Sequence, residues 1–226
     1  MRLIATLWVI RWRSKSKCIL FNSARKFDFK SELYFDNSDQ IKIVENTKLL
    51  GVEIQSNLKW DLNTDYICTR AYSRIWMIRR LKTLGATAEE LTDVYTKQVW
   101  CVLELAVSVW SPGITAGQVA QIERVQKTAC AVMLGASYID YSHALSMLNL
   151  DLLSVRKEPL CLRFARKCAK SGKYQDWFVE RKGDQVGIQT RSIKTDLIPV
   201  HTIMMRYERS PLPYPWMLLE RQGNLK

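Results

Sequence analysis

Residues 61–85 read DLNTDYICTRAYSRIWMIRRLKTLG, and an apolar residue returns at every third or fourth position. This spacing places the apolar side chains on one face of a helix. The residues in register are Ile67, Ala71, Ile75, Ile78 and Leu81. Gly85 follows, and glycine commonly ends a helix at its carboxyl end. The segment therefore predicts a helix that begins near Asp61 and ends before Gly85.

Four more helices are predicted after this one. Two of them open with a capping box, in which a Thr side chain and an acid or amide three residues later bond each other's backbone amides. The two boxes are Thr87 with Glu90 and Thr115 with Gln118. The four predicted helices cover about residues 87–109, 115–134, 138–148 and 152–173. Most of the chain between residues 61 and 173 is therefore predicted to be helical.

Short apolar runs separated by polar turns precede the helices and predict strands. The runs are residues 17–22, 33–35, 41–44 and 48–54. Four prolines near the carboxyl end predict an extended or irregular tail. The expected fold is α+β and mostly α, with a small antiparallel sheet followed by a helical bundle. The expected segments are an unassigned stretch 1–14, a strand region 15–60, a helical region 61–178 and a tail 179–226.

The chain is strongly basic, because 34 Lys and Arg residues oppose 22 Asp and Glu, for a net charge of +12 over 226 residues. Residues 1–30 have eight basic residues against one acidic, and residues 152–173 have seven against one. Such concentrated charge favours a polyanionic partner, either nucleic acid or an acidic membrane surface. The alternative is a solvated basic face without a partner.

In a helix over residues 152–173, at about 100° per residue, the basic residues gather on one side. They are Arg156, Arg163, Arg166, Lys167 and Lys170. The opposite side carries Leu160, Cys161, Phe164, Ala165 and Cys168, and Leu162 breaks the pattern. Pro159 leaves two alternatives. Either it is interior and costs about 3 kcal/mol, or the helix starts near Glu158 and the basic stripe loses Arg156.

No catalytic constellation is visible in the sequence. A polymerase needs two neighbouring carboxylates for its metal ions, and the chain has no Asp-Asp pair. Asp140 lies in the stretch YIDY, residues 138–141, with helical flanks, and Ser142-His143 lacks a third partner. The scattered glycines form no phosphate-binding loop. We therefore expect neither a metal nor a cofactor in this chain.

The six cysteines are expected to be free thiols, and five of them lie on or near apolar helix faces. These are Cys68, Cys101, Cys130, Cys161 and Cys168. Buried free cysteine is typical of proteins in a reducing compartment, and the absence of Cys-x-x-Cys argues against zinc. The apolar run at residues 3–10 is too short to span a bilayer and lacks a signal cleavage site. We expect an intracellular protein, cytoplasmic or nuclear, without a membrane partner.

Seven blocks in order along residues 15–215 resemble reverse transcriptases of non-LTR (LINE-type, jockey-like) retrotransposons. KSKCILFN at 15–22 is similar to the segment that follows the catalytic turn, and KLLGVEIQSNLKW at 48–60 looks like the primer-grip hairpin. The thumb and the helices after it are matched by IWMIRRLK at 75–82, VLELAVSVWSP at 102–112 and IERVQKTA at 122–129. The family's carboxyl end is matched by ALSMLNLDLLSVRK at 144–157 and RYERSPLPY at 206–214.

The resemblance implies a truncated piece of an RNA-directed DNA polymerase, with the end of the palm at 15–60 and the thumb at 61–178. Such a piece would be non-catalytic alone but would bind template and primer, RNA or DNA. The family's catalytic aspartates match no residue here, so Mg²⁺ is expected only for the complete parent polymerase. The site residues implied on the hairpin and thumb are Leu50, Gly51, Val52, Lys59, Trp60, Arg79, Arg80 and Lys82. The basic stripe adds Arg163, Arg166, Lys167 and Lys170.

Purely structural roles are an alternative for these residues. Gly51 could mark a strand bulge, and Trp60 could be a core aromatic. The whole chain could instead be a helical protein-interaction module with incidental charge and an unknown protein partner, and a complete small enzyme is the least supported possibility. A sheet edge without the rest of a palm also predicts aggregation of the isolated chain.

Overall fold

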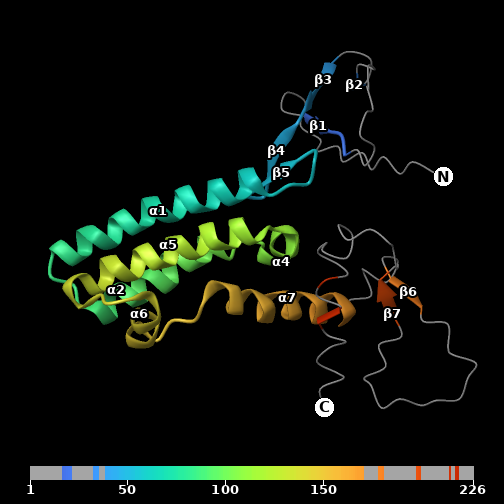
Figure 1. Ribbon diagram of the computed structural model, residues 1–226. Coiled ribbons are helices and arrows are strands. Elements are labelled where there is room, and N and C mark those ends of the chain that lie inside the picture. The colour runs from blue at the N-terminus through green and yellow to red at the C-terminus, as the bar shows by residue number, and fades with distance from the viewer. Residues whose placement is uncertain are drawn as a thin grey trace, which may run out of the picture. The chain divides into compact units, whose positions relative to one another are not determined.

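The structure of the protein, a computed structural model, describes residues 17–21, 33–35, 39–170, 178–180, 197–199, 214 and 217–218 (Figure 1). The chain divides into two compact units, residues 1–69 and 70–226. The unassigned stretch 1–14 and most of the predicted tail 179–226 lie outside the described residues. The fold is α+β and mostly helical, with the larger strands before the helices, as the sequence predicts.

Three short strands of the first unit form a mixed sheet in the order β1-β3-β2. They are β1 Lys17–Ile19, β2 Leu33–Phe35 and β3 Asp39–Val44. β2 is antiparallel to β3, but β1 is parallel to it, with Cys18 opposite Ile43. The expectation of a wholly antiparallel sheet is therefore wrong for β1. The stretch between β1 and β3 is long enough for the crossover that a parallel pair requires.

The apolar run 48–54 forms a hairpin and not a single strand. β4 (Asn46–Leu49) and β5 (Val52–Gln55) pair antiparallel, with Lys48 opposite Glu53. The two turn residues, Leu50 and Gly51, have φ of +49° and +89°. Positive φ at both positions is the signature of the two-residue type I′ turn, whose twist matches that of the flanking strands.

Helix α1 (Asp61–Thr83) begins in the first unit and ends in the second. In the second unit its buried residues are Ala71, Ile75 and Ile78, which is the face that the sequence predicts. Gly85 follows with φ of +91°, a left-handed conformation that glycine adopts without steric cost.

The second unit is built around helix α5, which contacts α2, α6 and α7 (Figure 1). The main helices are α2 Ala88–Tyr95, α5 Ala116–Leu134, α6 Tyr141–Leu148 and α7 Leu153–Lys170. Shorter helical pieces are η1 Thr96–Trp100, α3 Cys101–Leu103, α4 Val107–Trp110, η2 Ser111–Gly113 and η3 Gly135–Ser137. The strands β6 Phe178–Glu180 and β7 Leu197–Pro199 pair antiparallel.

Both capping boxes are present. The Thr87 amide donates to Glu90 Oε2 at 2.8 Å, and the Glu90 amide donates to Thr87 Oγ1 at 3.3 Å. The hydrogen bonds that the Thr87 amide and hydroxyl donate to the Glu90 carboxylate lower the pKa of Glu90. Thr115 and Gln118 repeat the arrangement at 2.7 and 3.3 Å, so both helix starts are confirmed.

The helix predicted over 87–109 is interrupted twice, which corrects the sequence pattern. The π-helical turn η1 follows α2, and Ala106 takes a left-handed φ of +50°. In an unbroken helix the carbonyl of Leu105 would accept from the amide of Val109, but that amide bonds to Ala106 O instead. The carbonyl of Leu105 thereby accepts a 2.8 Å hydrogen bond from Nε1 of the fully buried Trp110. The break thus satisfies a polar atom in the core.

Helix α7 begins at Leu153 and contains Pro159 in its interior, so the first of the two alternatives for this helix holds. Leu162, which breaks the expected pattern, is only 4% exposed. It is buried because Leu218 and Tyr214 pack against it and Cys161, and these two residues lie in the region of the predicted tail. The buried face of α7 is therefore wider than the sequence pattern indicates.

All six cysteines are free, as expected, but Cys101 is exposed and not buried. The π-helical turn before it adds a residue and rotates the next turn, which moves Cys101 off the buried face. Burial raises the pKa of Cys130 to about 12 and that of Cys161 to about 11, so both thiols stay protonated and unreactive at neutral pH. Within the described ranges, no helix is both long and apolar enough to cross a lipid bilayer.

Candidate nucleic-acid interface

The tip of the β4–β5 hairpin projects an apolar side chain into solvent. Leu50 is 92% exposed, and its positive φ costs a leucine about 1–2 kcal/mol. Neither burial nor backbone preference explains leucine at this position. The neighbouring Gly51 has no side chain, which allows close approach of another backbone to the turn.

The base of the same hairpin is held by the first turns of α1. The amide of Glu53 donates to Asn63 Oδ1 at 3.2 Å, and the amide of Leu62 donates to Gln55 Oε1 at 3.2 Å. Gln55 thereby caps an amide that the start of a helix leaves unpaired. The Lys48 ammonium lies 3.8 Å from the centre of the Tyr66 ring and donates to its hydroxyl. The hairpin and the start of α1 therefore form one rigid piece.

The remaining candidates on this piece differ in their exposure. Val52 is buried and Trp60 is half-buried, so both support the hairpin in addition to any contact with a ligand. Lys59 is exposed, and its amide donates to Asn57 Oδ1 at 2.8 Å. Leu50, Gly51 and Lys59 are the candidates here whose position favours contact with a partner.

The three basic candidates on α1 do not share one role. Arg79 and Arg80 are exposed. Lys82 instead donates to the carbonyls of Val132 at 2.6 Å and Met133 at 2.9 Å, in the last turn of α5. A cation at the carboxyl end of a helix satisfies carbonyls that lack partners within the helix and interacts favourably with the helix dipole. Lys82 therefore joins α1 to α5.

Replacing Lys82 with Met should lower the free energy of unfolding by about 1–2 kcal/mol, because two carbonyls of α5 lose a charged donor. Arg79→Met is the matched control, since it removes the same charge from an exposed position on the same helix and should change stability by less than about 0.5 kcal/mol. Urea unfolding followed by circular dichroism measures both. Equal stabilities of the two variants would contradict the capping role.

The basic stripe on α7 is present in part. Three of its cations are exposed, namely Arg163, Arg166 and Lys167. The neighbouring residues Ala165 and Cys168 are buried. The side chain of Lys170 lies outside the described residues. These three exposed cations lie within five consecutive residues of one helix and form a compact positive surface.

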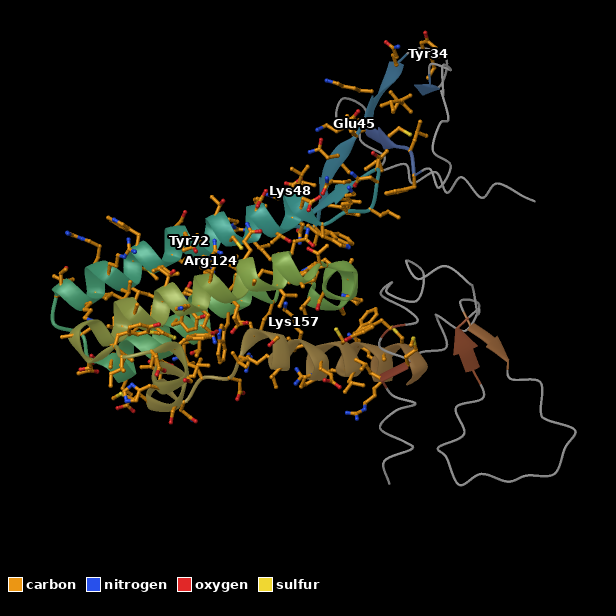
Figure 2. All side chains as sticks on the ribbon, viewed as in Figure 1. Tyr34, Glu45, Lys48, Tyr72, Arg124 and Lys157 are labelled. Atoms are coloured by element: carbon orange, nitrogen blue, oxygen red, sulfur yellow. The ribbon has the colours of Figure 1, made fainter. Side chains whose placement is uncertain are left out.

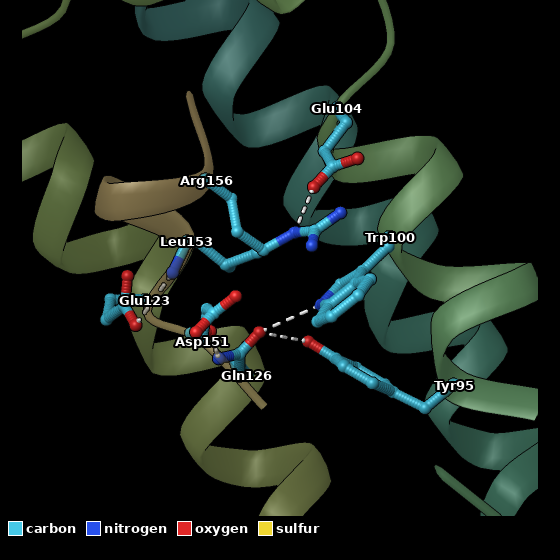
Figure 3. Close-up of polar contacts among 8 residues, drawn as sticks. All are labelled: Tyr95, Trp100, Glu104, Glu123, Gln126, Asp151, Leu153 and Arg156. Atoms are coloured by element: carbon cyan, nitrogen blue, oxygen red, sulfur yellow. Dashed lines mark hydrogen bonds and ion pairs between the residues drawn. The ribbon is translucent and has the colours of Figure 1, made fainter. Parts of the chain in front are cut away.

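Arg156, expected in the same stripe, faces the interior of the unit. Its Nε bonds Glu104 Oε1 at 2.7 Å, and its guanidinium lies 3.6 Å from the centre of the Trp100 ring (Figure 3). The neighbouring Lys157 is buried, with its ammonium 5.6 Å from the centre of the Trp110 ring (Figure 2). The expectation for Arg156 is wrong because an acid and an indole from another part of the chain bind it.

The cations of α1 and those of α7 lie at opposite ends of the second unit. Lys82 donates to Val132 and Met133 at the carboxyl end of α5. The amide of Leu153, in the first turn of α7, instead donates to Glu123, in the middle of α5. α7 then runs away from that end of α5 (Figure 1). Val132 lies roughly ten residues after Glu123 on α5, and Arg163 lies roughly ten residues after Leu153 on α7. At 1.5 Å per residue, these two stretches together place Lys82 about 30 Å from Arg163. The structure does not bring these two groups of cations together.

A buried polar network connects the helices of the second unit (Figure 3). The Tyr95 hydroxyl and Trp100 Nε1 donate to Gln126 Oε1 at 2.8 and 3.0 Å. Gln126 Nε2 donates to the carbonyl of Asp151 at 2.8 Å. Burial raises the pKa of Tyr95 well above its ordinary value. The network therefore ties α2, η1, α5 and the residue Asp151 just before α7 to one another.

Asp140 has a structural role, as its sequence context favours. It precedes α6 and its Oδ1 accepts from the amide of His143 at 2.7 Å and from Ser142 Oγ at 2.9 Å. The His143 amide is the first cause of the lowered pKa of Asp140. In the part of the chain that the structure describes, no group of three or more His, Cys, Asp and Glu side chains could hold a metal ion.

Two aromatic residues that the sequence pattern did not single out are exposed beside the α1 cations. Trp76 is 61% exposed and Tyr72 is also exposed, one turn apart on the same helix. The guanidinium of Arg80 lies 5.9 Å from the centre of the Trp76 ring. An aromatic pair spaced by four residues, next to an Arg-Arg dipeptide in the predicted helix, is the signal that would have found them.

Comparison with known proteins gives no relative: no family model, no curated protein and no solved structure matches the chain. The resemblance to non-LTR reverse transcriptases therefore depends on the sequence blocks alone. The features of the chain that bear on its function are the exposed cations, the hairpin and the net charge.

Proposed function

We propose that the protein binds nucleic acid, RNA or DNA, through phosphate contacts, as a non-catalytic, thumb-like part of a non-LTR reverse transcriptase. The observation that carries the proposal is the exposed trio Arg163, Arg166 and Lys167 on α7. It lies in a chain of net charge +12. Side chains of this kind, projecting from a helix surface, contact phosphates without reading the bases.

The hairpin of the first unit supports a second contact. Its exposed tip at Leu50 and Gly51, with Lys59 nearby in sequence, belongs to the block that resembles the primer grip. The chain contains no Asp-Asp pair, so the proposal assigns it binding of template and primer without nucleotide addition. The proposed location is intracellular, where its nucleic-acid partner would be.

Salt dependence tests the proposal. With about five phosphate contacts, a plot of log affinity against log salt concentration should have a slope of about −4 to −5, because each contact releases condensed counterions. Fluorescence anisotropy of a labelled RNA–DNA hybrid, titrated at several NaCl concentrations, measures this slope. An affinity that stays constant from low to moderate salt would refute the proposal.

A charge-matched comparison locates the contacts. The triple variant Arg163→Gln, Arg166→Gln, Lys167→Gln should weaken binding at least tenfold and reduce the slope to about −2, because three contacts are lost. The control triple Lys42→Gln, Lys97→Gln, Lys127→Gln removes the same net charge from exposed positions elsewhere. It should weaken binding less than about threefold, since distant charges are screened. Equal losses in the two triples would show that only net charge matters.

Docking of a protein partner is the second candidate function, and one observation favours it. Ile139, Met147, Leu152 and Val155 are exposed apolar residues at the ends of α6 and the start of α7. These four residues lie within 17 positions of the sequence, and exposed apolar side chains that form one patch are typical of protein interfaces. Replacing Ile139 and Val155 with Ser separates the candidates, because it should leave nucleic-acid affinity unchanged and abolish a protein contact at this surface.

A further inference from the structure

One face of α1 in the second unit exposes aromatic rings next to cations. The face consists of Tyr72, Trp76, Arg79 and Arg80, which we call the Trp76 face. All four residues are exposed, while Ala71, Ile75 and Ile78 on the adjoining side of the helix are buried. At about 100° per residue, the four side chains fall within a sector of about 100°. They therefore form a continuous strip along the helix.

Burial does not explain the aromatic residues of this strip. A large side chain gains about 1.5–3 kcal/mol when it is fully buried, and Trp76 at 61% exposure forgoes much of that gain. Tyr72 precedes it by four residues, so the two rings lie about one helical turn, 5.4–6 Å, apart along the axis. The guanidinium of Arg80, 5.9 Å from the centre of the Trp76 ring, places a charge beside the indole.

The charge around the strip selects the class of ligand. Residues 69–84 contain five basic residues and no Asp or Glu. A polyanion that also presents flat apolar faces matches such a surface, and an unpaired nucleic-acid strand is a ligand of this kind. Bases in a duplex are already stacked on one another, so rings on a helix surface cannot stack on them. Every nucleotide of an unpaired strand supplies both features, whereas a protein partner would have to combine acidic and apolar side chains at matching positions.

We infer that the Trp76 face binds an unpaired nucleic-acid strand, with bases stacked on Trp76 and Tyr72 and phosphates held by Arg79 and Arg80. The inference rests on the proposed function and extends it from phosphate contact to selection of single-stranded over double-stranded ligand. Phosphate contacts alone do not make this selection, because both forms carry the same groups. The strip and the cations of α7 lie on different helices of the second unit, so the two surfaces contact different parts of a ligand.

The test compares one labelled DNA oligonucleotide of unstructured polythymidine with the same strand annealed to its complement, by fluorescence anisotropy at fixed salt. Trp76→Ala should weaken binding of the single strand by about 5-fold to 150-fold, the range that loss of one base–aromatic stack gives. Binding of the duplex should change less than twofold. Trp76→Phe should recover most of the loss, because an aromatic ring is kept.

Leu84→Ala is the matched control. Leu84 lies directly after the same helix, is 80% exposed and is apolar but not aromatic. Its replacement should leave both affinities unchanged, and circular dichroism should show the wild-type fold for all three variants, since the substituted side chains contribute little to the core.

The outcomes separate the inference from the proposed function. If Trp76→Ala matches wild type while the α7 triple variant binds weakly, the inference is wrong and the proposed function stands. Equal losses for single strand and duplex would also overturn the inference. If the wild-type protein binds neither ligand, both are wrong. A Trp76→Ala variant that keeps its nucleic-acid affinity but loses self-association in sedimentation would assign the face to a protein contact and overturn the inference.

Discussion

Replacing Gln126 with Leu is expected to lower the free energy of unfolding by about 3–5 kcal/mol, the largest effect of a single substitution considered for this protein. Gln126 is fully buried, and its amide accepts from Tyr95 and Trp100 and donates to Asp151. Leu has a similar volume, so little cavity forms. The loss comes mainly from the Tyr95 hydroxyl, which is fully buried, and from Nε1 of the half-buried Trp100, because both donors lose their acceptor. Asp151 is exposed, so its carbonyl can bond water instead.

Urea unfolding followed by far-UV circular dichroism measures the effect. Lys127→Leu serves as the control, because it introduces the same side chain at the next position of α5, where the native residue is exposed. The control should change stability by less than about 0.5 kcal/mol. If Gln126→Leu stays within about 1 kcal/mol of wild type, then water or rearranged side chains satisfy the three partners, and the network is not a determinant of the fold.

The features that the sequence predicts best are local ones. The capping boxes at Thr87 and Thr115, and the helix end at Gly85, need only residues three or four positions apart. The apolar period of α1 likewise predicts which side chains it buries. A pattern of this range determines where helices start, where they end and which face turns inward.

Contacts that do not follow the helical spacing of three or four residues explain what the sequence could not predict. The break at Ala106 leaves the carbonyl of Leu105 to accept from the buried Trp110. Arg156 faces inward because it pairs with Glu104, which lies 52 positions earlier in the chain. Leu162 is buried because Leu218 packs against it. Glu104 and Leu218 lie far beyond the reach of a helical period, and Leu105 precedes Trp110 by five residues, a spacing that does not follow the helical period of three or four.

In the candidate site, too, the sequence predicts some features and misses others. Charge patterning correctly gives Arg163, Arg166 and Lys167 as exposed, but it cannot distinguish them from Lys82, which is bound to the end of α5. Exposure of an aromatic residue is equally invisible in a pattern that treats every apolar residue as part of a core. The cations available to a partner are therefore fewer than the net charge suggests, and the aromatic residue Trp76 adds to them.

Replacing Pro159 with Ala is expected to raise the free energy of unfolding by about 1–3 kcal/mol. Pro159 lies inside α7, where it has no amide to donate to the carbonyl of Val155 and where its ring crowds that carbonyl. Proline is about 3 kcal/mol less favourable than alanine in a helix interior. Pro159 is exposed, so the substitution leaves no cavity. Part of the gain is offset because the unfolded chain with alanine has more conformations.

Ser154→Ala, at an exposed position in the first turn of the same helix, is the control and should change stability by less than about 0.5 kcal/mol. Thermal unfolding followed by circular dichroism measures both variants. A gain for Pro159→Ala without loss of nucleic-acid affinity would mean that the proline only strains the helix. A gain accompanied by weaker binding would mean that a kink at Pro159 directs Arg163, Arg166 and Lys167 toward the ligand. An unchanged or lower stability would contradict the cost assigned to the proline, because the helix would already have relaxed around it.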